Sequence, residues 1–346
     1  MTGAETEHHL TEELVAFLSL PETHDDGPDI VDVRETHMSW VFLADAYVYK
    51  LKKPLRTAYL DFSTLAARER NCRQEVRLNR RLAPDIYLGV VAITRQPDGA
   101  LALGGAGETV DWLVRMRRLP EDRMLDAAIR SGSVTAEDIE TVAALLIRFY
   151  KRLEPAGNTV ADYLLRLEHQ LHLDRAIVCD TRFDLPPGLA ERVLDRLMSA
   201  VKSGDGPIEG ALQAKRIVEG HGDLRPEHVC LLDPPVIIDC LEFDRDLRLV
   251  DPFDDIAYLA MECGFIGAPW IGEVLMARIA DGLGVRPPDS LIAFYTAFRA
   301  CLRARLSLAH LLDPAPRTPE KWLPQAIAYL EIADRESAKL TLPEAR

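Results

Sequence analysis

The chain has 346 residues, of which 48% are hydrophobic and 28% charged, so it is long enough for one large domain or two lobes with buried cores. Its formal net charge of -14 disfavours general nucleic-acid binding, because an acidic surface repels phosphate backbones. The N-terminus shows no basic and apolar leader, and no apolar run reaches about 18 residues, so we expect a cytoplasmic protein that does not cross a membrane.

The first part of the chain, residues 1–118, predicts a small sheet with one inserted helix. Residues 1–28 are expected to form a tail and an amphipathic helix, with apolar side chains at helical spacing over residues 10–18 and Thr11 as a candidate N-cap. Runs of β-branched and aromatic residues then predict strands around a second helical pattern. These elements are the strands Trp40–Leu43 and Tyr47–Leu51, the helix 63–82 with Ser63 or Thr64 as its cap, and the strands within 86–116.

The second part, residues 119–346, is predicted to be mainly helical. A short segment with a strand-like pattern, residues 217–246, interrupts it. A β-rich part followed by a helical part is typical of two lobes. The predicted helices are 135–153, 159–176, 188–203, 270–283, 289–311 and 320–338.

The interrupting segment carries the residues with the strongest chemical signal. It contains HGDLRPEH (221–228) and, soon after, PPVIIDCLEF (234–243). Asp223 lies in a polar turn before an apolar strand, and Asp239 follows the apolar run of the next strand. Two carboxylates separated by a hairpin can divide their work: one orients a hydroxyl or accepts its proton, and the other binds a divalent cation.

The predicted sheet offers a lysine and a glutamate that could meet. Lys50 and Lys52 share one strand face, because side chains alternate along a strand. Glu75 falls on the apolar face of the helix 63–82, where a charge needs a partner, and Lys50 is the natural one. The alternatives are an edge-strand lysine that deters aggregation and a surface glutamate among arginines.

These motifs resemble those of the aminoglycoside-phosphotransferase and choline-kinase group, in which HGD replaces the HRD of protein kinases and DPxxDIA follows downstream. The stretches ETHMSWVFLADAYVYKLKKP, EVRLNRRLAPDIYLGV and HGDLRPEHVCLL resemble bacterial enzymes of this type whose substrate is unassigned. The resemblance covers about residues 30–265. It implies an α+β, bilobal protein-kinase-like fold, with a small β-rich nucleotide-binding lobe (1–118) containing one key helix and a larger helical catalytic and acceptor-binding lobe (119–346).

The resemblance also implies roles for individual residues. Asp223 would orient and deprotonate the acceptor hydroxyl, and Asp239 would bind Mg²⁺ that bridges the nucleotide phosphates. Lys50, held by Glu75, would contact the α- and β-phosphates. Asp255 would brace the catalytic loop through its backbone, although it could instead be a helix N-cap.

Three further positions belong to the predicted site. His221 would support the catalytic loop. Ser39 lies in ETHMSW (35–40), which stands where kinases have a glycine-rich loop, so its backbone N–H could reach a phosphate. Met116 begins the linker between the lobes and would lie near the adenine, or would be an ordinary core methionine.

His228 departs from the kinase pattern, because it stands where kinases place a second metal-binding Asn. An imidazole suits softer metals than Mg²⁺, so Mn²⁺ could bind instead, or His228 could simply pack. The nearby carboxylates of Glu227 and Glu242 could compensate as ligands.

The leading interpretation is a small-molecule kinase that transfers the γ-phosphate of ATP (or GTP) to a hydroxyl or amine. Its partners would be a nucleotide and a small acceptor, and the sequence specifies neither the acceptor nor an oligomeric state. Acidic residues within 244–262 would suit a cationic acceptor. A nucleotide-binding pseudokinase or regulatory protein is the first alternative. A metal-dependent phosphohydrolase is the second, and it leaves Lys50 and Glu75 unexplained.

Overall fold

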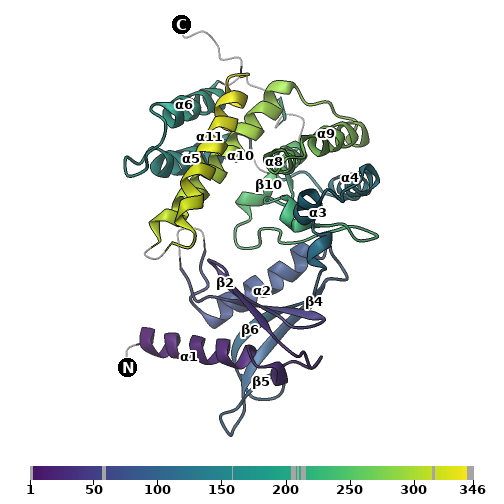
Figure 1. Cartoon of the computed structure of the whole chain (residues 1–346), viewed down its shortest axis with the longest axis vertical. Coiled ribbons are helices and arrows are strands. Elements are labelled where there is room, and N and C mark those ends of the chain that lie inside the picture. The colour runs from purple at the N-terminus through teal and green to yellow at the C-terminus, as the bar shows by residue number, and fades with distance from the viewer. Residues whose placement is uncertain are drawn as a thin grey trace. The chain divides into compact units, whose positions relative to one another are not determined.

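The computed structural model consists of two compact units (Figure 1). The first unit comprises Met1–Ala127 and Glu227–Arg245, and the second comprises Ala128–Pro226 and Asp246–Arg346. The structure describes residues 3–56, 60–157, 159–203, 208, 210–211, 216–313 and 316–340.

An antiparallel sheet with strand order β1-β2-β3-β6-β4-β5 forms the centre of the first unit. Two long helices flank it, and a short hairpin of β8 and β9 completes the unit. The strands and the second helix predicted from the sequence are confirmed. The elements are α1 (Gly3–Leu18), β1 (Asp32–Glu35), β2 (Ser39–Leu43), β3 (Tyr47–Lys52), α2 (Leu65–Asn79), β4 (Tyr87–Arg95), β5 (Leu101–Leu103), β6 (Glu108–Arg117), β8 (Val229–Cys230) and β9 (Val236–Ile237).

The two faces of this sheet bury different side chains, because neighbouring residues of a strand point to opposite faces. Tyr49 and Leu51 of β3 are buried in a cluster with Leu14 and Leu18 of α1. Lys50 lies between them in the sequence and therefore points to the other face, where α2 packs. The alternation along a single strand thus separates the apolar support of the sheet from its charged residues.

The β8–β9 hairpin is held in the first unit by the cluster that α2 forms with the sheet. Cys230 and Val236 are buried in this cluster with Val76 of α2. For this reason the segment 227–245 lies in the first unit, whereas a single boundary after residue 118 would assign it to the second. The nucleotide-binding and acceptor-binding roles of the lobes remain predictions.

The second unit consists mainly of packed helices. Helix α10 packs against α5, α8 and α11, and α9 packs against α4 and α8, while a short antiparallel ladder joins β7 and β10. The helices predicted from the sequence are confirmed. The elements are α3 (Leu125–Ser131, which begins in the first unit), α4 (Ala136–Lys151), α5 (Val160–Val178), α6 (Leu189–Lys202), β7 (Val218–Glu219), β10 (Leu249–Val250), α8 (Pro252–Phe265), α9 (Pro269–Leu283), α10 (Asp289–Ala309) and α11 (Pro319–Ser337).

Three features differ from the sequence-based expectations. Helix α1 begins at Gly3, so Thr11 lies inside it and does not cap it, because the Ala and Glu residues before Thr11 are good helix formers. Helix α8 is additional: nearly all its side chains are buried, so it shows no amphipathic period. Asp251, not Asp255, caps this helix by accepting a hydrogen bond from the Phe253 N–H.

Within the described part of the chain, no helix combines the length and the apolar character needed to cross a lipid bilayer.

Candidate active site

A chain of alternating charges runs through the first unit, from β3 to the residues that follow β9. The Lys50 Nζ lies 3.0 Å from the Glu75 Oε1 and 3.0 Å from the Asp239 Oδ1. The Lys52 Nζ lies 2.7 Å from the Glu75 Oε2 and 2.5 Å from the Glu242 Oε1. The predicted pair of Lys50 and Glu75 is therefore present, and Lys52 is a second partner of the same glutamate.

Burial and charge together set the protonation of this network. Burial acts to lower the pKa of Lys50, but the charges of Asp239, Glu75 and Glu242 outweigh it and hold the pKa well above its usual range. Burial acts to raise the pKa of Glu75, yet the two lysines bring it below its usual value. Burial raises the pKa of Glu242. Lys50 and Glu75 are therefore both charged at neutral pH.

The backbone of Asp239 adopts a left-handed conformation, with φ of +62°, that residues other than glycine rarely take. Two hydrogen bonds hold this turn: the Asp239 N–H donates to the Tyr87 hydroxyl (3.2 Å), and the Cys240 N–H donates to the Asn79 Oδ1 (2.9 Å). Strained residues of this kind cluster at functional sites, where the surroundings over-determine them. Tyr87 and Asn79 escape sequence analysis because they lie 152 and 161 residues from their partners.

The carboxylate of Asp239 is a more suitable ligand for Mg²⁺ than the imidazole of its neighbour His228. The Asp239 side chain is 45% exposed, and its Oδ2 lies 3.5 Å from the His228 Nε2. A half-exposed carboxylate suits Mg²⁺, whereas an imidazole nitrogen suits softer metals. Glu242 is bound to Lys52 rather than turned to a metal. Among the described residues no group of three or more His, Cys, Asp or Glu side chains is arranged to hold a metal ion.

Asp255 fixes the backbone of the loop that carries Asp223, within the second unit. Its carboxylate accepts hydrogen bonds from the N–H groups of His221 (2.8 Å) and Gly222 (3.0 Å). It also accepts one from the Tyr150 hydroxyl (3.0 Å) and is fully buried. These are the contacts that a brace of the loop requires, and the catalytic role of the loop remains a prediction.

Arg299 of α10 holds the same loop from the carbonyl side. It donates a hydrogen bond to the Gly222 carbonyl (3.0 Å), while its Nε and NH2 donate to the two oxygens of Asp254 (2.7 and 2.8 Å). Both peptide groups of Gly222 are thus occupied by buried side chains. Sequence reasoning missed Arg299, because nothing in the helix sequence distinguishes it from a surface arginine.

The glycines on either side of His221 are required by close contacts. A Cβ at Gly220 would lie 2.6 Å from the Asp255 Oδ2, and a Cβ at Gly222 would lie 2.8 Å from the Leu247 carbonyl oxygen. Gly222 also has a φ of +84°, which favours glycine. His221 is completely buried, and its Nδ1 lies 3.3 Å from the donating N–H of Asp223. The HGD motif therefore packs tightly as well as presenting Asp223.

Asp223 itself is partly exposed and has a close cationic neighbour. Its side chain is 23% exposed, and its Oδ1 lies 3.1 Å from the Arg225 Nε. Asp223 and Asp239 belong to different units.

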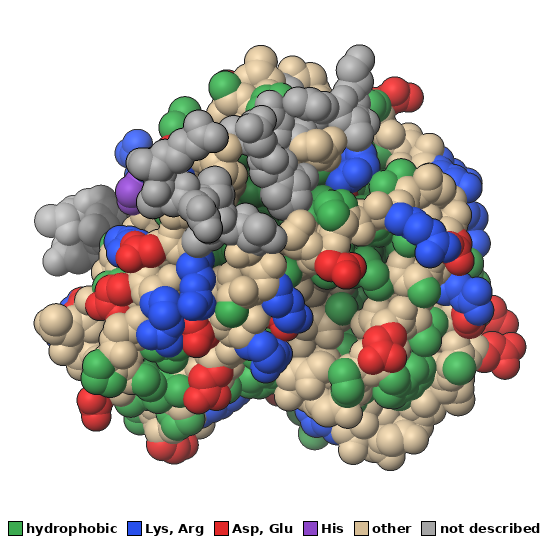
Figure 2. All heavy atoms as spheres, turned by 90° about the horizontal axis from the view of Figure 1, so that it is seen from above, with side chains coloured by type: hydrophobic (Ala, Val, Ile, Leu, Met, Phe, Trp, Pro, Cys, Tyr) green, Lys and Arg blue, Asp and Glu red, His purple; other side chains and the backbone are tan. Residues whose placement is uncertain are grey.

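The acidic residues that would suit a cationic acceptor are largely compensated. Asp254 is bound by Arg299, and Glu262 lies 3.1 Å from Arg303. Figure 2 shows acidic and basic side chains intermingled on the one face that it draws, whereas Asp254 and Glu262 are buried. The charge of this region therefore gives no support to a cationic acceptor.

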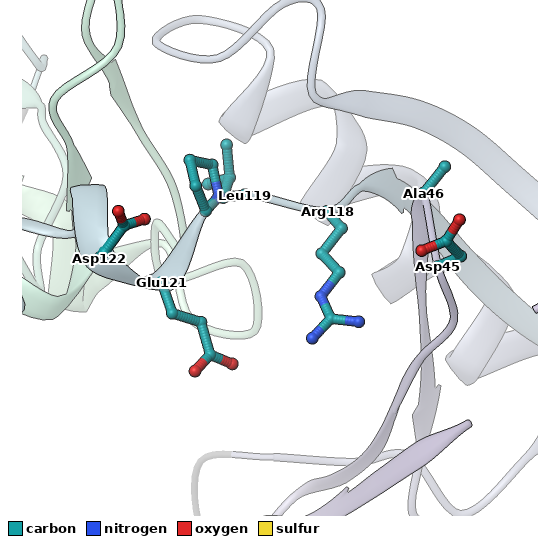
Figure 3. A pocket seen from close by; sticks show the side chains of 7 residues that line it. Asp45, Ala46, Arg118, Leu119, Glu121 and Asp122 are labelled. Carbon is teal, nitrogen blue, oxygen red and sulfur yellow. The ribbon is translucent and has the colours of Figure 1, made fainter. Parts of the chain in front are cut away.

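Ser39 and Met116 occupy ordinary structural positions in the first unit. The Ser39 N–H donates to the Thr36 Oγ1 (3.0 Å), so this N–H already has an acceptor. Met116 packs against the apolar cluster between α2 and the sheet. Just after it, the linker borders an open hollow of about 510 Å³, into which Figure 3 shows Arg118 and Glu121 projecting. Contact of Ser39 or Met116 with a nucleotide remains a prediction.

Comparison of sequences finds relatives among curated proteins. An uncharacterized protein of Mycobacterium tuberculosis and one of Mycobacterium bovis are each 31% identical over 325 residues, which is 90% of this chain and 61% of theirs. The chain thus spans about three fifths of the length of these curated relatives. No family model matches the chain.

Solved structures of kinases cover nearly the whole chain. A choline/ethanolamine kinase family protein from Mesorhizobium loti matches with a TM-score of 0.51 and 14% identity, covering 95% of this chain and 98% of that one. Choline kinase from Cryptosporidium parvum matches with 0.54 and 10%, covering 95% and 96%. A thermostable mutant of aminoglycoside phosphotransferase APH(4)-Ia matches with 0.51 and 12%, covering 94% and 99%. The predicted fold is confirmed: this chain has the protein-kinase-like fold of aminoglycoside phosphotransferases and choline kinases.

Proposed function

We propose that the chain is a small-molecule kinase that transfers the γ-phosphate of ATP to a hydroxyl or amine of an acceptor. The observation that carries the proposal is the Lys50–Glu75 pair, whose lysine also lies 3.0 Å from Asp239. A charged lysine, held by a buried glutamate and next to a half-exposed carboxylate in a strained turn, suits the binding of phosphates and a cation.

Each residue has a defined role in this proposal. Lys50 binds the α- and β-phosphates, and Asp239 supplies a ligand for Mg²⁺ or Mn²⁺. The bound metal would neutralise charge on the phosphates. Asp223 orients the acceptor hydroxyl and takes its proton, and Asp255 keeps the loop of Asp223 in place. Phosphoryl transfer depends mainly on positioning and charge stabilisation, which a rigid loop and a fixed lysine provide.

The shared fold supports both substrates of the reaction. The similar aminoglycoside phosphotransferase was solved in a ternary complex with AMP-PNP and hygromycin B. We extend the binding of a nucleotide and of a small acceptor to this chain as part of the proposal.

A nucleotide-binding pseudokinase is the second candidate, and His228 favours it. Its imidazole lies 3.5 Å from Asp239, where a kinase would present an oxygen ligand for a second metal. Nucleotide binding without phosphate transfer to any acceptor would identify a pseudokinase.

The test measures thermal stabilisation by ATP and GTP, each with Mg²⁺ or Mn²⁺. A ligand at a hundredfold excess over its Kd stabilises the native state by about 2.7 kcal/mol. We expect a metal-dependent rise in Tm that Asp239→Ala abolishes and Asp85→Ala, at an exposed carboxylate of the same unit, preserves. A screen of acceptors for ADP release follows. If no nucleotide raises the Tm of the parent chain, the proposed function is wrong.

A further inference from the structure

The two lysines of β3 occupy different environments, although both contact Glu75. The Lys50 side chain is 18% exposed, and its second partner, Asp239, is 45% exposed. The Lys52 side chain is 1% exposed, and its second partner, Glu242, is 8% exposed. The Lys52 Nζ also lies 4.8 Å above the ring of the buried Phe62. Lys50 therefore sits at the open end of the network and Lys52 at its closed end.

The charges of the network explain why two lysines are needed. Lys50 and Lys52 face three carboxylates, those of Glu75, Asp239 and Glu242, which leaves one negative charge in excess. If Lys50 turns to a phosphate, Glu75 still has Lys52 at 2.7 Å. Without Lys52, Glu75 would share its one cation with the phosphate, and a buried carboxylate that is only partly compensated is strongly unfavourable.

We propose that Lys52 and Glu242 form a positioning pair that holds Glu75 and the Asp239 turn in place, so that Lys50 can exchange Asp239 for the nucleotide phosphates while it stays beside Glu75. This inference rests on the proposed function, since it needs a phosphate ligand for Lys50. It assigns Lys50 as the lysine that contacts phosphate and Lys52 as the one that keeps both its partners.

The same pair links the Asp239 turn to the sheet and to α2. Glu242 follows Asp239 by three residues, and its carboxylate reaches Lys52 on β3, which in turn reaches Glu75 on α2. When Lys50 releases Asp239, this second connection keeps the turn attached. The Asp239 carboxylate then loses the neighbouring Lys50 charge and keeps its position, which favours the binding of a cation.

The test removes the pair as a unit, because the single change Lys52→Met would leave Glu242 buried without a cation. The variant is Lys52→Met with Glu242→Gln. The matched control is Arg68→Met with Asp111→Asn, which removes another buried ion pair between α2 and the sheet. In this pair the Arg68 Nε lies 2.8 Å from the Asp111 Oδ1, and each side chain is 6% exposed. Urea unfolding of both variants is measured first, and binding is then compared at a temperature where each is folded.

The readout is the Kd of Mg·ATP and of adenosine, measured by titration calorimetry. We expect the Lys52/Glu242 variant to raise the Kd of Mg·ATP about tenfold or more and to leave that of adenosine within about twofold, because only the phosphate contact depends on Lys50. The Arg68/Asp111 control is expected to keep both values.

Three results would overturn the inference. An unchanged Kd for Mg·ATP would show that Lys52 does not assist Lys50. An equal loss for adenosine would show that the pair acts only through the fold. A parent chain that binds no Mg·ATP would refute the proposed function and this inference with it, whereas the first two results leave the proposed function standing.

Discussion

The change Asp255→Asn tests how the loop before Asp223 is held. The Asp255 Oδ2 accepts hydrogen bonds from the His221 N–H (2.8 Å) and the Tyr150 hydroxyl (3.0 Å), and its Oδ1 accepts one from the Gly222 N–H (3.0 Å). An Asn side chain has only one accepting oxygen. If that oxygen takes the place of Oδ2, the amide NH2 faces the Gly222 N–H, so that two donors oppose each other.

The expected cost follows from these contacts. A hydrogen bond to a charged acceptor contributes about 1.5–3 kcal/mol, and a buried N–H without an acceptor costs about 1–3 kcal/mol. We therefore expect Asp255→Asn to lower the free energy of unfolding by about 2–4 kcal/mol. The control Tyr150→Phe removes one donor but keeps the carboxylate and both backbone contacts, so about 1 kcal/mol is expected.

Urea unfolding at pH 8 is the assay for both variants. Burial raises the pKa of Asp255 to about 6, so at pH 8 the carboxylate is charged in the parent chain, and the stability that separates the parent chain from Asp255→Asn is smaller at pH 8 than near pH 4. Amide hydrogen exchange at His221 and Gly222 provides a local readout, and its protection should fall in Asp255→Asn but not in Tyr150→Phe. If the two variants lose equal stability and equal protection, the loop is not held by the carboxylate.

Three further predictions test the loop, the roles of the two aspartates and a buried carboxylate. Gly222→Ala should lower the free energy of unfolding, measured by urea titration, by about 2 kcal/mol or more. The added Cβ would lie 2.8 Å from the Leu247 carbonyl oxygen, and the φ of +84° favours glycine. Unchanged stability would show that the loop can shift. Asp223→Asn should abolish phosphate transfer but change the Kd of Mg·ATP by less than about threefold, whereas Asp239→Asn should raise that Kd. Equal effects of the two variants on the Kd would contradict the proposed roles of the two aspartates. Burial raises the pKa of Asp174 from 3.8 to about 7, so the folded state binds this proton more tightly than the unfolded state does. As the pH rises from about 4 to about 7, the parent chain should lose stability relative to Asp174→Asn by up to about 1.4 kcal/mol per pH unit, and a constant difference in urea titrations would refute the raised pKa.

Much of the fold follows from local patterns. The alternation in β3 and the helical period of α2 predict both elements, and together they predict that Lys50 and Glu75 face each other. Helix α8 is not predictable in this way, since burial on all sides removes the polar face that reveals a helix. The place of the segment 227–245 in the first unit also depends on packing, because it follows from the contact of Cys230 and Val236 with α2.

For the site, the amino-acid sequence alone specifies the spacing of Asp223, Asp239 and Asp255. It also specifies the strand face shared by Lys50 and Lys52, because motifs and side-chain alternation are local properties. The groups that these residues contact depend on how distant parts of the chain pack together. Four contacts of the site join residues that lie 77 to 190 positions apart in the sequence. They are the hydrogen bonds of Tyr87 and Asn79 with the Asp239 turn, that of Arg299 with Gly222, and the ion pair of Lys52 with Glu242. These long-range contacts form because a buried charged or polar group needs a partner, and the fold supplies that partner from a distant part of the chain.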